Sequence, residues 1–242
     1  MDCSLSKKIK KCAIIQSSYI PWRGYFDIIN SVDEFILLDD TQYTKRDWRN
    51  RNKIKCATGL QWLTIPVYVK GRFSQHINDV VVCDSRWAKQ HWRAIELCYG
   101  KANFFTSLAD KLYWLYWEVQ KLKKLSEINY LTISSLCQWL NIHTKLSYST
   151  DYQIKSDEKN DKLIQLCLAS ESHSYLSGPS AKTYLQIDQF KQTGISVEYM
   201  NYEDYPVYPQ RFHSFEPFVS ILDLLCNVGL EEAPTFMKSF KK

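Results

Sequence analysis

Two apolar runs that each end in a polar loop decide the fold. Residues 12–25 read CAIIQSSYIPWRGY, and residues 35–53 read FILLDDTQYTKRDWRNRNK. Each stretch opens with an apolar run, which predicts a buried strand, and continues into polar, aromatic and charged side chains. In open α/β sheets, ligands bind in the crevice outside the carboxyl ends of the strands. The sequence therefore predicts a ligand site where these two strands end.

Strands and helices alternate along most of the remaining chain. Apolar runs predict strands at 11–16, 35–38, 51–56, 62–67, 77–82, 144–149, 174–176 and 195–200. Apolar residues at helical spacing predict helices at 25–31, 157–170, 181–192 and 220–229, and further helices between Ser85 and Leu140. Strand–helix alternation is typical of a parallel sheet with crossover helices.

These elements predict an α/β fold with a mainly parallel Rossmann-like sheet flanked by helices and with a central helical segment. We expect a single α/β domain over 11–229, a helical insertion over 85–142, and a C-terminal tail over 230–242 that frays from Lys238 onward. Asn103 is the expected N-cap of the second helix of the insertion. The aromatic residues of that helix are expected to pack in the core: Tyr113, Trp114, Tyr116 and Trp117.

Composition and cysteine usage exclude several classes of protein. The 31 Lys and Arg residues only slightly exceed the 26 Asp and Glu residues, so overall charge does not indicate a nucleic-acid-binding protein. The eight cysteines form no Cys-x-x-Cys pair and the five histidines are scattered, which predicts reduced, mostly buried cysteines and no metal site. No apolar run has membrane-spanning length, and residues 1–11 lack the apolar segment of a signal peptide. We expect a soluble cytoplasmic protein with no membrane partner.

The second polar loop is locally basic. Between Lys45 and Lys55 six Lys and Arg residues accompany one acid, Asp47, and Trp48 lies inside the run. A basic run is more often a solvated face, but the interleaved tryptophan and asparagines favour an anionic ligand here. Arg supplies a two-pronged donor that fits phosphate or carboxylate.

A third loop, residues 177–180 (SGPS), follows a predicted strand and precedes a predicted helix. Alone it is a simple turn with a helix cap; its amides and hydroxyls are also suited to an anion. Together with the two earlier loops it predicts that distant segments meet in one crevice, with Asp39, Arg51 and Ser177 in the same pocket.

The strand-end carboxylates Asp39 and Asp40 are costly to bury unless they are paired. A structural ion-pair network and a catalytic role both remain open for them. In a catalytic role they would hold a substrate ammonium or bind magnesium beside a phosphate. His76 and His91 are weaker candidates for a base. No Gly-x-Ser-x-Gly elbow, Walker loop or Gly-x-Gly-x-x-Gly is present.

Two blocks carry a family resemblance: Gln16-x-x-Tyr-x-Pro-Trp-x-Gly-Tyr-Phe and Leu38-Asp-Asp-x-Gln-Tyr-x-Lys-Arg-x-Trp-x-Asn-Arg-Asn-Lys. With the blocks that begin at Trp62, Tyr175 and Ser220, the chain resembles the WbqC-like family from about Ile14 to Gly229. Cys226 departs from the larger apolar residue expected there. The resemblance implies a bacterial surface-polysaccharide pathway, in particular O-antigen synthesis. The strand followed by Pro-Trp-x-Gly-Tyr and a helix is also similar in position to the first signature of HxGH nucleotidyltransferases, without its two histidines.

The resemblance implies a transferase or ligase that attaches glycine, or a similar amino acid, by an amide bond to the amine of a nucleotide-linked 4-amino-4,6-dideoxy sugar. The amino acid must arrive activated, which requires ATP with Mg²⁺, an aminoacyl-tRNA or a thioester donor. The expected catalytic residues are Asp39, Asp40 and Gln16. The expected substrate-binding residues are Tyr19, Trp22, Gln42, Tyr43, Arg46, Arg49, Asn50, Arg51, Asn52, Lys53, Ser177, Gly178 and Ser180.

Two alternatives remain open at the level of the sequence. A nucleic-acid-binding or nucleic-acid-modifying protein would use the Lys45–Lys55 segment on its surface and bind in a salt-dependent manner. A non-catalytic scaffold would show only stability changes when Asp39 or Arg51 is replaced.

Overall fold

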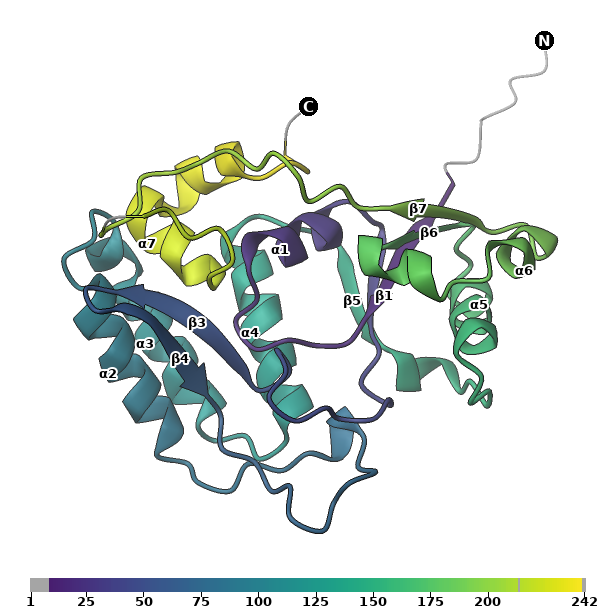
Figure 1. The fold of residues 1–242 in the computed structure, drawn as a ribbon, viewed down its shortest axis with the longest axis horizontal. Helices are drawn as coiled ribbons and strands as arrows, with labels where there is room; N and C mark the ends of the chain where they lie inside the picture. Colours follow the sequence, from purple (N-terminus) through teal and green to yellow (C-terminus); the bar gives the residue numbers. More distant parts are fainter. Residues whose placement is uncertain (1–8, 213, 241–242) are drawn as a thin grey trace.

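The computed structural model describes residues 9–212 and 214–240 (Figure 1). Its main sheet contains β1 (Lys11–Ile15), β2 (Glu34–Leu37), β5 (Lys145–Tyr148), β6 (Ser174–Ser177) and β7 (Ser196–Tyr199). The strands lie in the order β5-β2-β1-β6-β7, and every neighbouring pair is parallel. This confirms the predicted α/β fold with a parallel sheet. The predicted absence of a signal peptide concerns residues 1–11, and residues 1–8 of this segment lie outside the described residues.

The direction of strand addition reverses beside β1. The chain passes from β1 to β2 and then β5 on one side, and later adds β6 and β7 on the other. In a doubly wound sheet such a reversal separates the loops at the carboxyl ends of two adjacent strands and leaves a crevice between them. The switch point of this sheet therefore lies between β1 and β6.

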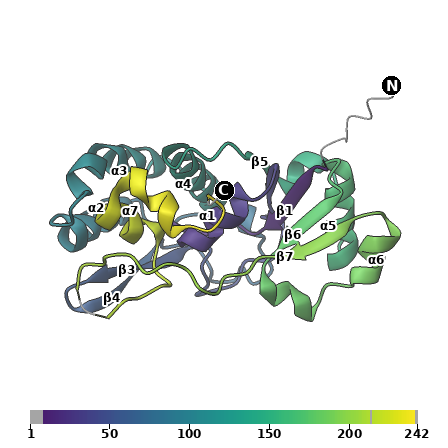
Figure 2. The same ribbon diagram turned by 90° about the horizontal axis from the view of Figure 1, so that it is seen from above.

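Alternate side chains of β1 pack in two separate hydrophobic cores, one on each face of the sheet. Cys12 and Ile14 pack with α5 (Lys159–Ala169) and α6 (Ile187–Gln192), whereas Ala13 belongs to the core that contains α1 (Arg23–Asn30). Figure 2 shows α5 and α1 on opposite sides of the sheet. Because consecutive strand residues point to opposite faces, one apolar run can cover both layers.

The predicted central helical segment consists of α2 (Trp87–Tyr99), α3 (Phe105–Val119) and α4 (Leu125–Trp139). These helices pack with α7 (Ile221–Glu232) and with an antiparallel hairpin of β3 (Arg51–Cys56) and β4 (Gly59–Thr64). They share the larger apolar core with α1. Short 3₁₀ helices complete the described elements: η1 (Ile77–Asp79), η2 (Ser149–Tyr152), η3 (Pro179–Thr183) and η4 (Ala233–Phe236).

Three local predictions were wrong. Residues 77–82 form η1 and isolated bridges at Val81 and Val82 rather than a strand. The helix expected at 181–192 is split into η3 and α6, and the Asn160 side chain accepts a hydrogen bond from the Gln186 N–H in the break (3.0 Å). Asn103 does not cap α3, whose N-cap is Phe104 without a side-chain bond.

The aromatic residues of α3 divide between the core and the surface. Of the four residues predicted to pack in the core, only Tyr116 is buried, whereas Tyr113, Trp114 and Trp117 are each about half exposed, at 54%, 50% and 52%. The expectation that all four pack in the core was therefore wrong for three of them. The buried face of α3 is instead an aliphatic stripe that includes Leu108, Leu112, Leu115 and Val119.

The cysteines also differ from the expectation. Cys56 of β3 and Cys98 of α2 form a disulfide, with their Cα atoms 4.7 Å apart. The free cysteines among the described residues are Cys12, Cys83, Cys137, Cys167 and Cys226, of which only Cys83 is exposed. The disulfide links two elements that already pack against each other.

The C-terminal segment does not fray at Lys238. Met237 is fully buried, and the backbone N–H groups of Lys238 and Ser239 donate to the Asp27 carboxylate at 3.0 and 2.8 Å. Asp27 is fully buried in α1 and therefore needs such donors. Lys241 and Lys242 lie outside the described residues. Within 9–212 and 214–240, no helix combines the length and apolar character needed to cross a membrane.

Candidate functional site

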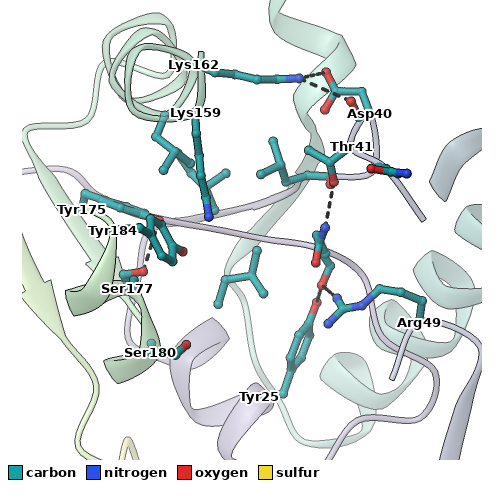
Figure 3. Close-up of a pocket in the computed structure, with 18 of the residues that line it drawn as sticks. Tyr25, Asp40, Thr41, Arg49, Lys159, Lys162, Tyr175, Ser177, Ser180 and Tyr184 are labelled. Atoms are coloured by element: carbon teal, nitrogen blue, oxygen red, sulfur yellow. Dashed lines mark hydrogen bonds and ion pairs between the residues drawn. The ribbon is translucent and has the colours of Figure 1, made fainter. Parts of the chain in front are cut away.

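A cavity of about 1000 Å³ opens at the carboxyl ends of β1, β2 and β6. It lies at the switch point of the sheet, where doubly wound α/β proteins bind ligands. Gln16 follows β1, Asp40 follows β2, and the 177–180 loop ends β6, so all three predicted loops reach this cavity (Figure 3).

Half of the expected site residues line the cavity. Those that do are Gln16, Trp22, Asp40, Gln42, Arg49, Ser177, Gly178 and Ser180. Those that do not are Tyr19, Asp39, Tyr43, Arg46, Asn50, Arg51, Asn52 and Lys53. The prediction that Asp39, Arg51 and Ser177 share one pocket was therefore wrong, because only Ser177 reaches it.

Asp39 and Asp40 have opposite environments although they are neighbours in the chain. Asp39 is 1% exposed; its carboxylate accepts the Ser17 N–H at 2.8 Å and the hydroxyl of Ser126. Burial raises the pKa of Asp39 against the effect of these hydrogen bonds. Asp39 therefore fixes the loop after β1 to α4 and does not face a ligand.

Asp40 is the strand-end carboxylate that faces the cavity. One oxygen pairs with the Lys162 ammonium at 2.7 Å, and the other accepts the Ser149 hydroxyl at 2.6 Å. Its side chain remains 20% exposed, so a substrate can still contact it. Of the two acids, Asp40 alone can orient or deprotonate a ligand group here.

Arg49 crosses from the basic loop to the end of β1. Its guanidinium donates to the backbone carbonyls of Gln16 and Ser17 at 2.9 and 2.8 Å, and the Tyr25 hydroxyl donates to the same Gln16 carbonyl at 3.0 Å. The Gln16 side chain donates to Thr41 at 2.9 Å. These bonds join Gln16 to Arg49 and Thr41, and Arg49 lies on the side of the cavity away from α5 (Figure 3).

Several lining residues escaped the sequence analysis. They are Tyr25, Thr41, Asp157, Lys159, Lys162, Tyr175, Tyr184 and Tyr202, and His76 had been considered only as an isolated base. Lys159 and Lys162 lie in the first turns of α5 beside the acids Glu158 and Asp161, so nothing in the local sequence singled out these lysines.

Four expected ligand residues serve the scaffold instead. The Tyr19 hydroxyl lies within hydrogen-bond distance of His91 and Tyr116, at 2.9 and 2.8 Å. Asn50 donates to the Ile65 carbonyl, and Asn52 donates to the carbonyls of Tyr19 and Ile20. Tyr43 is also buried. Burial lowers the pKa of His91 to about 4, so His91 is neutral at pH 7. His91 also does not line the cavity.

Arg51 and Lys53 of the basic segment lie on strand β3 of the hairpin rather than in the cavity. The Arg51 guanidinium carbon lies 4.2 Å from the Trp62 ring centre, and the Lys53 ammonium lies 5.9 and 5.2 Å from the ring centres of Trp48 and Trp62. Both tryptophans are partly exposed, at 40% and 41%. Arg46 accepts a hydrogen bond from Arg51 on its backbone carbonyl. This set (Arg51, Lys53, Trp48 and Trp62) is called the hairpin cluster below.

A second cavity of about 320 Å³ adjoins the first. It is lined by Ser18, Pro21, Trp48, Asn52 and Phe218, and it shares Ile15, Trp22, Tyr25 and Arg49 with the larger cavity. These four shared residues, called the common wall below, line both ligand-sized spaces. The larger space is the more charged, since Asp40, Asp157, Lys159 and Lys162 all line it.

Charge decides what the larger cavity can bind. Arg49, Lys159 and Lys162 supply cations, and Asp40 and Asp157 supply carboxylates. Among residues 9–212 and 214–240, no cluster of three His, Cys, Asp or Glu side chains is arranged to hold a metal ion. The arrangement suits a ligand that carries both an anionic part and an amine.

The fold and cavity define an α/β protein with a polar ligand site at the switch point of a parallel sheet. The model of the WbqC-like protein family matches residues 16–234, and the chain belongs to this family. It is 49% identical over 230 residues to the uncharacterized protein Rv1507c of Mycobacterium tuberculosis (strain ATCC 25618 / H37Rv), covering 95% of this chain and 98% of that protein. No solved structure gives a significant match.

Proposed function

We propose that this protein is an amide-forming transferase or ligase. It joins glycine, or a similar amino acid, to the amine of a nucleotide-linked 4-amino-4,6-dideoxy sugar in bacterial surface-polysaccharide synthesis. The observation that carries the proposal is the charged cavity of about 1000 Å³ at the switch point, which Asp40 lines together with Lys159, Lys162 and Arg49. Such a cavity offers separate contacts to an amine and to an anionic nucleotide.

The reaction requires a neutral amine and an activated acyl group. The amine nitrogen forms a bond to the acyl carbon, the bond from that carbon to the donor's oxygen or sulfur breaks, and the ammonium proton leaves through a base. Asp40 is the cavity carboxylate with a partly exposed side chain beside Lys162, and it fits the role of orienting the amine and accepting its proton. Gln16 and Arg49 fit the role of holding the polar groups on the opposite wall.

The adjoining cavities support a reaction of two substrates. The donor must reach the amine, and ligands in the two spaces would be closest where both contact the common wall. The donor is an adenylate made from ATP with Mg²⁺, an aminoacyl-tRNA or a thioester. Each of these supplies the activated carbonyl that a free carboxylate lacks.

The test is formation of the glycyl adduct. Protein incubated with a TDP-4-amino-4,6-dideoxy sugar and either glycine with Mg-ATP, glycyl-tRNA or a glycyl thioester should give the N-glycyl sugar nucleotide by mass spectrometry. Asp40→Asn should lower the rate by about 100-fold or more, in the range of lost general-base catalysis. Asp188→Asn, on an α6 side chain that is 92% exposed, is the matched control and should react as the wild type does. Absence of the adduct with every donor would contradict the proposal.

A second candidate function rests on the hairpin cluster. Partly exposed tryptophans beside Arg51 and Lys53 are the combination that binds single-stranded nucleic acid by stacking and charge. This candidate predicts RNA binding that weakens steeply with salt and is lost in Trp62→Ala. RNA binding without the glycyl adduct would favour a nucleic-acid-binding protein over the proposed enzyme.

A further inference from the structure

Lys159 is the cation of the cavity that lacks a carboxylate partner among residues 9–212 and 214–240. Arg49 pairs with Asp47 at 3.7 Å, and Lys162 pairs with Asp40 at 2.7 Å. The Lys159 ammonium instead lies over the Tyr184 ring, 3.1 Å from its centre. Partial loss of solvent lowers the pKa of Lys159, but the side chain remains exposed. The ammonium of Lys159 is therefore accessible to a ligand in the cavity.

The Lys159 side chain points into the cavity, so its ammonium can contact a bound ligand. Lys159 extends from α5 into the cavity on the side where Tyr184 and Ser177 lie (Figure 3). The Glu158 carboxylate caps this end of α5 and Asp161 lies in its first turn, so the helix dipole is already offset by acids. The cation that a ligand meets on this side of the cavity is therefore the Lys159 ammonium itself.

The β6 loop supplies neutral donors next to Lys159. Ser177 and Ser180 line the same cavity, and Ser177 is held by a contact of 3.2 Å between its hydroxyl and that of Tyr175. A Cβ atom built on Gly178 would meet no atom within 4 Å, so the loop backbone faces open space. A ligand can therefore approach this backbone closely.

We propose that Lys159, together with Ser177 and Ser180, binds the diphosphate of a nucleoside diphosphate. The inference rests on the proposed function in one respect, because this site would hold the nucleotide part of the proposed nucleotide-sugar substrate. A diphosphate matches an accessible ammonium flanked by hydroxyl donors, because such charge-assisted hydrogen bonds are about twice as strong as neutral ones. It also leaves Asp40 and Lys162 free to contact the sugar end.

Equilibrium binding of TDP, UDP and thymidine tests the site without requiring any reaction. Wild-type protein should bind at least one of the diphosphates and prefer TDP to thymidine. Lys159→Met should weaken diphosphate binding by about 10- to 100-fold, the effect of one lost hydrogen bond to a charged group, and leave thymidine binding unchanged. Lys159→Arg should retain most of the affinity. Lys191→Met, on an α6 side chain that is 69% exposed, is the matched control and should bind as the wild type does.

A footprint on the wild type makes the test independent of how the variants fold. Bound diphosphate should protect the Lys159 amine from acetylation, measured by mass spectrometry, and leave Lys191 reactive. Unchanged diphosphate affinity in Lys159→Met, no protection of Lys159, or no diphosphate binding at all would each overturn the site. If Lys159-dependent binding is found and no glycyl adduct forms, the diphosphate site stands and the proposed reaction falls.

Discussion

At the scale of single residues, the two aspartates after β2 show that a shift of one residue along the chain changes the role of a carboxylate. Asp39 is enclosed by Ser17 and Ser126, whereas Asp40 faces the cavity with Lys162. Two adjacent residues of this loop therefore differ in role, one holding the fold and the other lining the cavity with Thr41 and Gln42. Glu34 of β2 is a third acid of the same region and is fully buried.

Glu34 should make stability depend on pH in the acid range. Burial alone would raise the pKa of Glu34, but hydrogen bonds from Lys10, Tyr152, Ser147 and Lys145 outweigh it and lower the pKa to about 2. A lowered pKa means that the ionised form favours the folded state. This stability is present above the ordinary value of 4.5 and is lost as the pH falls toward about 2.

Glu34→Gln tests this assignment. At pH 7 the variant should lose about 2 kcal/mol of unfolding free energy in urea titrations, because it weakens hydrogen bonds to a charged acceptor. The difference from the wild type should shrink as the pH is lowered through the same window. Glu198→Gln, which changes a half-exposed acid paired with Lys11, is the control and should have a much smaller effect. A difference that stays constant from pH 7 to the acid range would contradict the assignment.

At the scale of elements, α7 contains a break that its sequence explains. Gly229 has φ 82° and ψ 170° inside the helix, a conformation available essentially only to glycine. A Cβ atom there would lie 2.6 Å from the Phe104 ring. The turn between α2 and α3 thus packs directly against the backbone of α7.

Gly229→Ala should destabilise the protein by about 2–4 kcal/mol, since backbone strain and overpacking each cost about 1–3 kcal/mol. Thermal and urea unfolding would measure the loss. Gly178→Ala is the matched control, because Gly178 has ordinary backbone angles and open space around its Cβ position. Equal stability of the two variants would show that the break in α7 does not require glycine.

The sequence was most informative about elements and strand ends. The predicted strands overlap every strand of the parallel sheet. Continuous apolar runs mark the inner strands β1 and β2, whereas the edge strands β5 and β7 alternate polar and apolar residues. The same runs could not tell which of two adjacent polar residues points inward, so Asp39 and Asp40 were treated alike. Arg51 was assigned to the cavity as part of the basic Lys45–Lys55 segment, but the β3–β4 hairpin directs Arg51 onto Trp62. The importance of Lys159 depends on α5 lying beside the loops after β1 and β2, which are distant in the sequence.

At the scale of the whole molecule, the C-terminal segment closes the fold on α1. Asp27 receives hydrogen bonds from the Tyr205 hydroxyl at 2.5 Å and from the Lys238 and Ser239 N–H groups at 3.0 and 2.8 Å. Met237 fills the adjacent core. The first helix and the last described residues are therefore one structural unit.

Truncation after Phe236 should destabilise the protein by about 3 kcal/mol or more, because it leaves Asp27 buried without most of its donors and removes the apolar Met237 side chain. Calorimetric unfolding would measure the loss. Ser239→Ala keeps the backbone donors and should cost only about 1 kcal/mol, the worth of one hydrogen bond. A truncated protein as stable as the wild type would show that the segment does not support α1.

The common wall has a consequence for kinetics. Ile15, Trp22, Tyr25 and Arg49 line both cavities, so a ligand in either space would contact these side chains, and the proposed reaction joins ligands held in both spaces. Initial rates measured over a grid of donor and acceptor concentrations should then follow a sequential pattern, with intersecting double-reciprocal lines. Changing Trp22 should shift the apparent Michaelis constants of both substrates together.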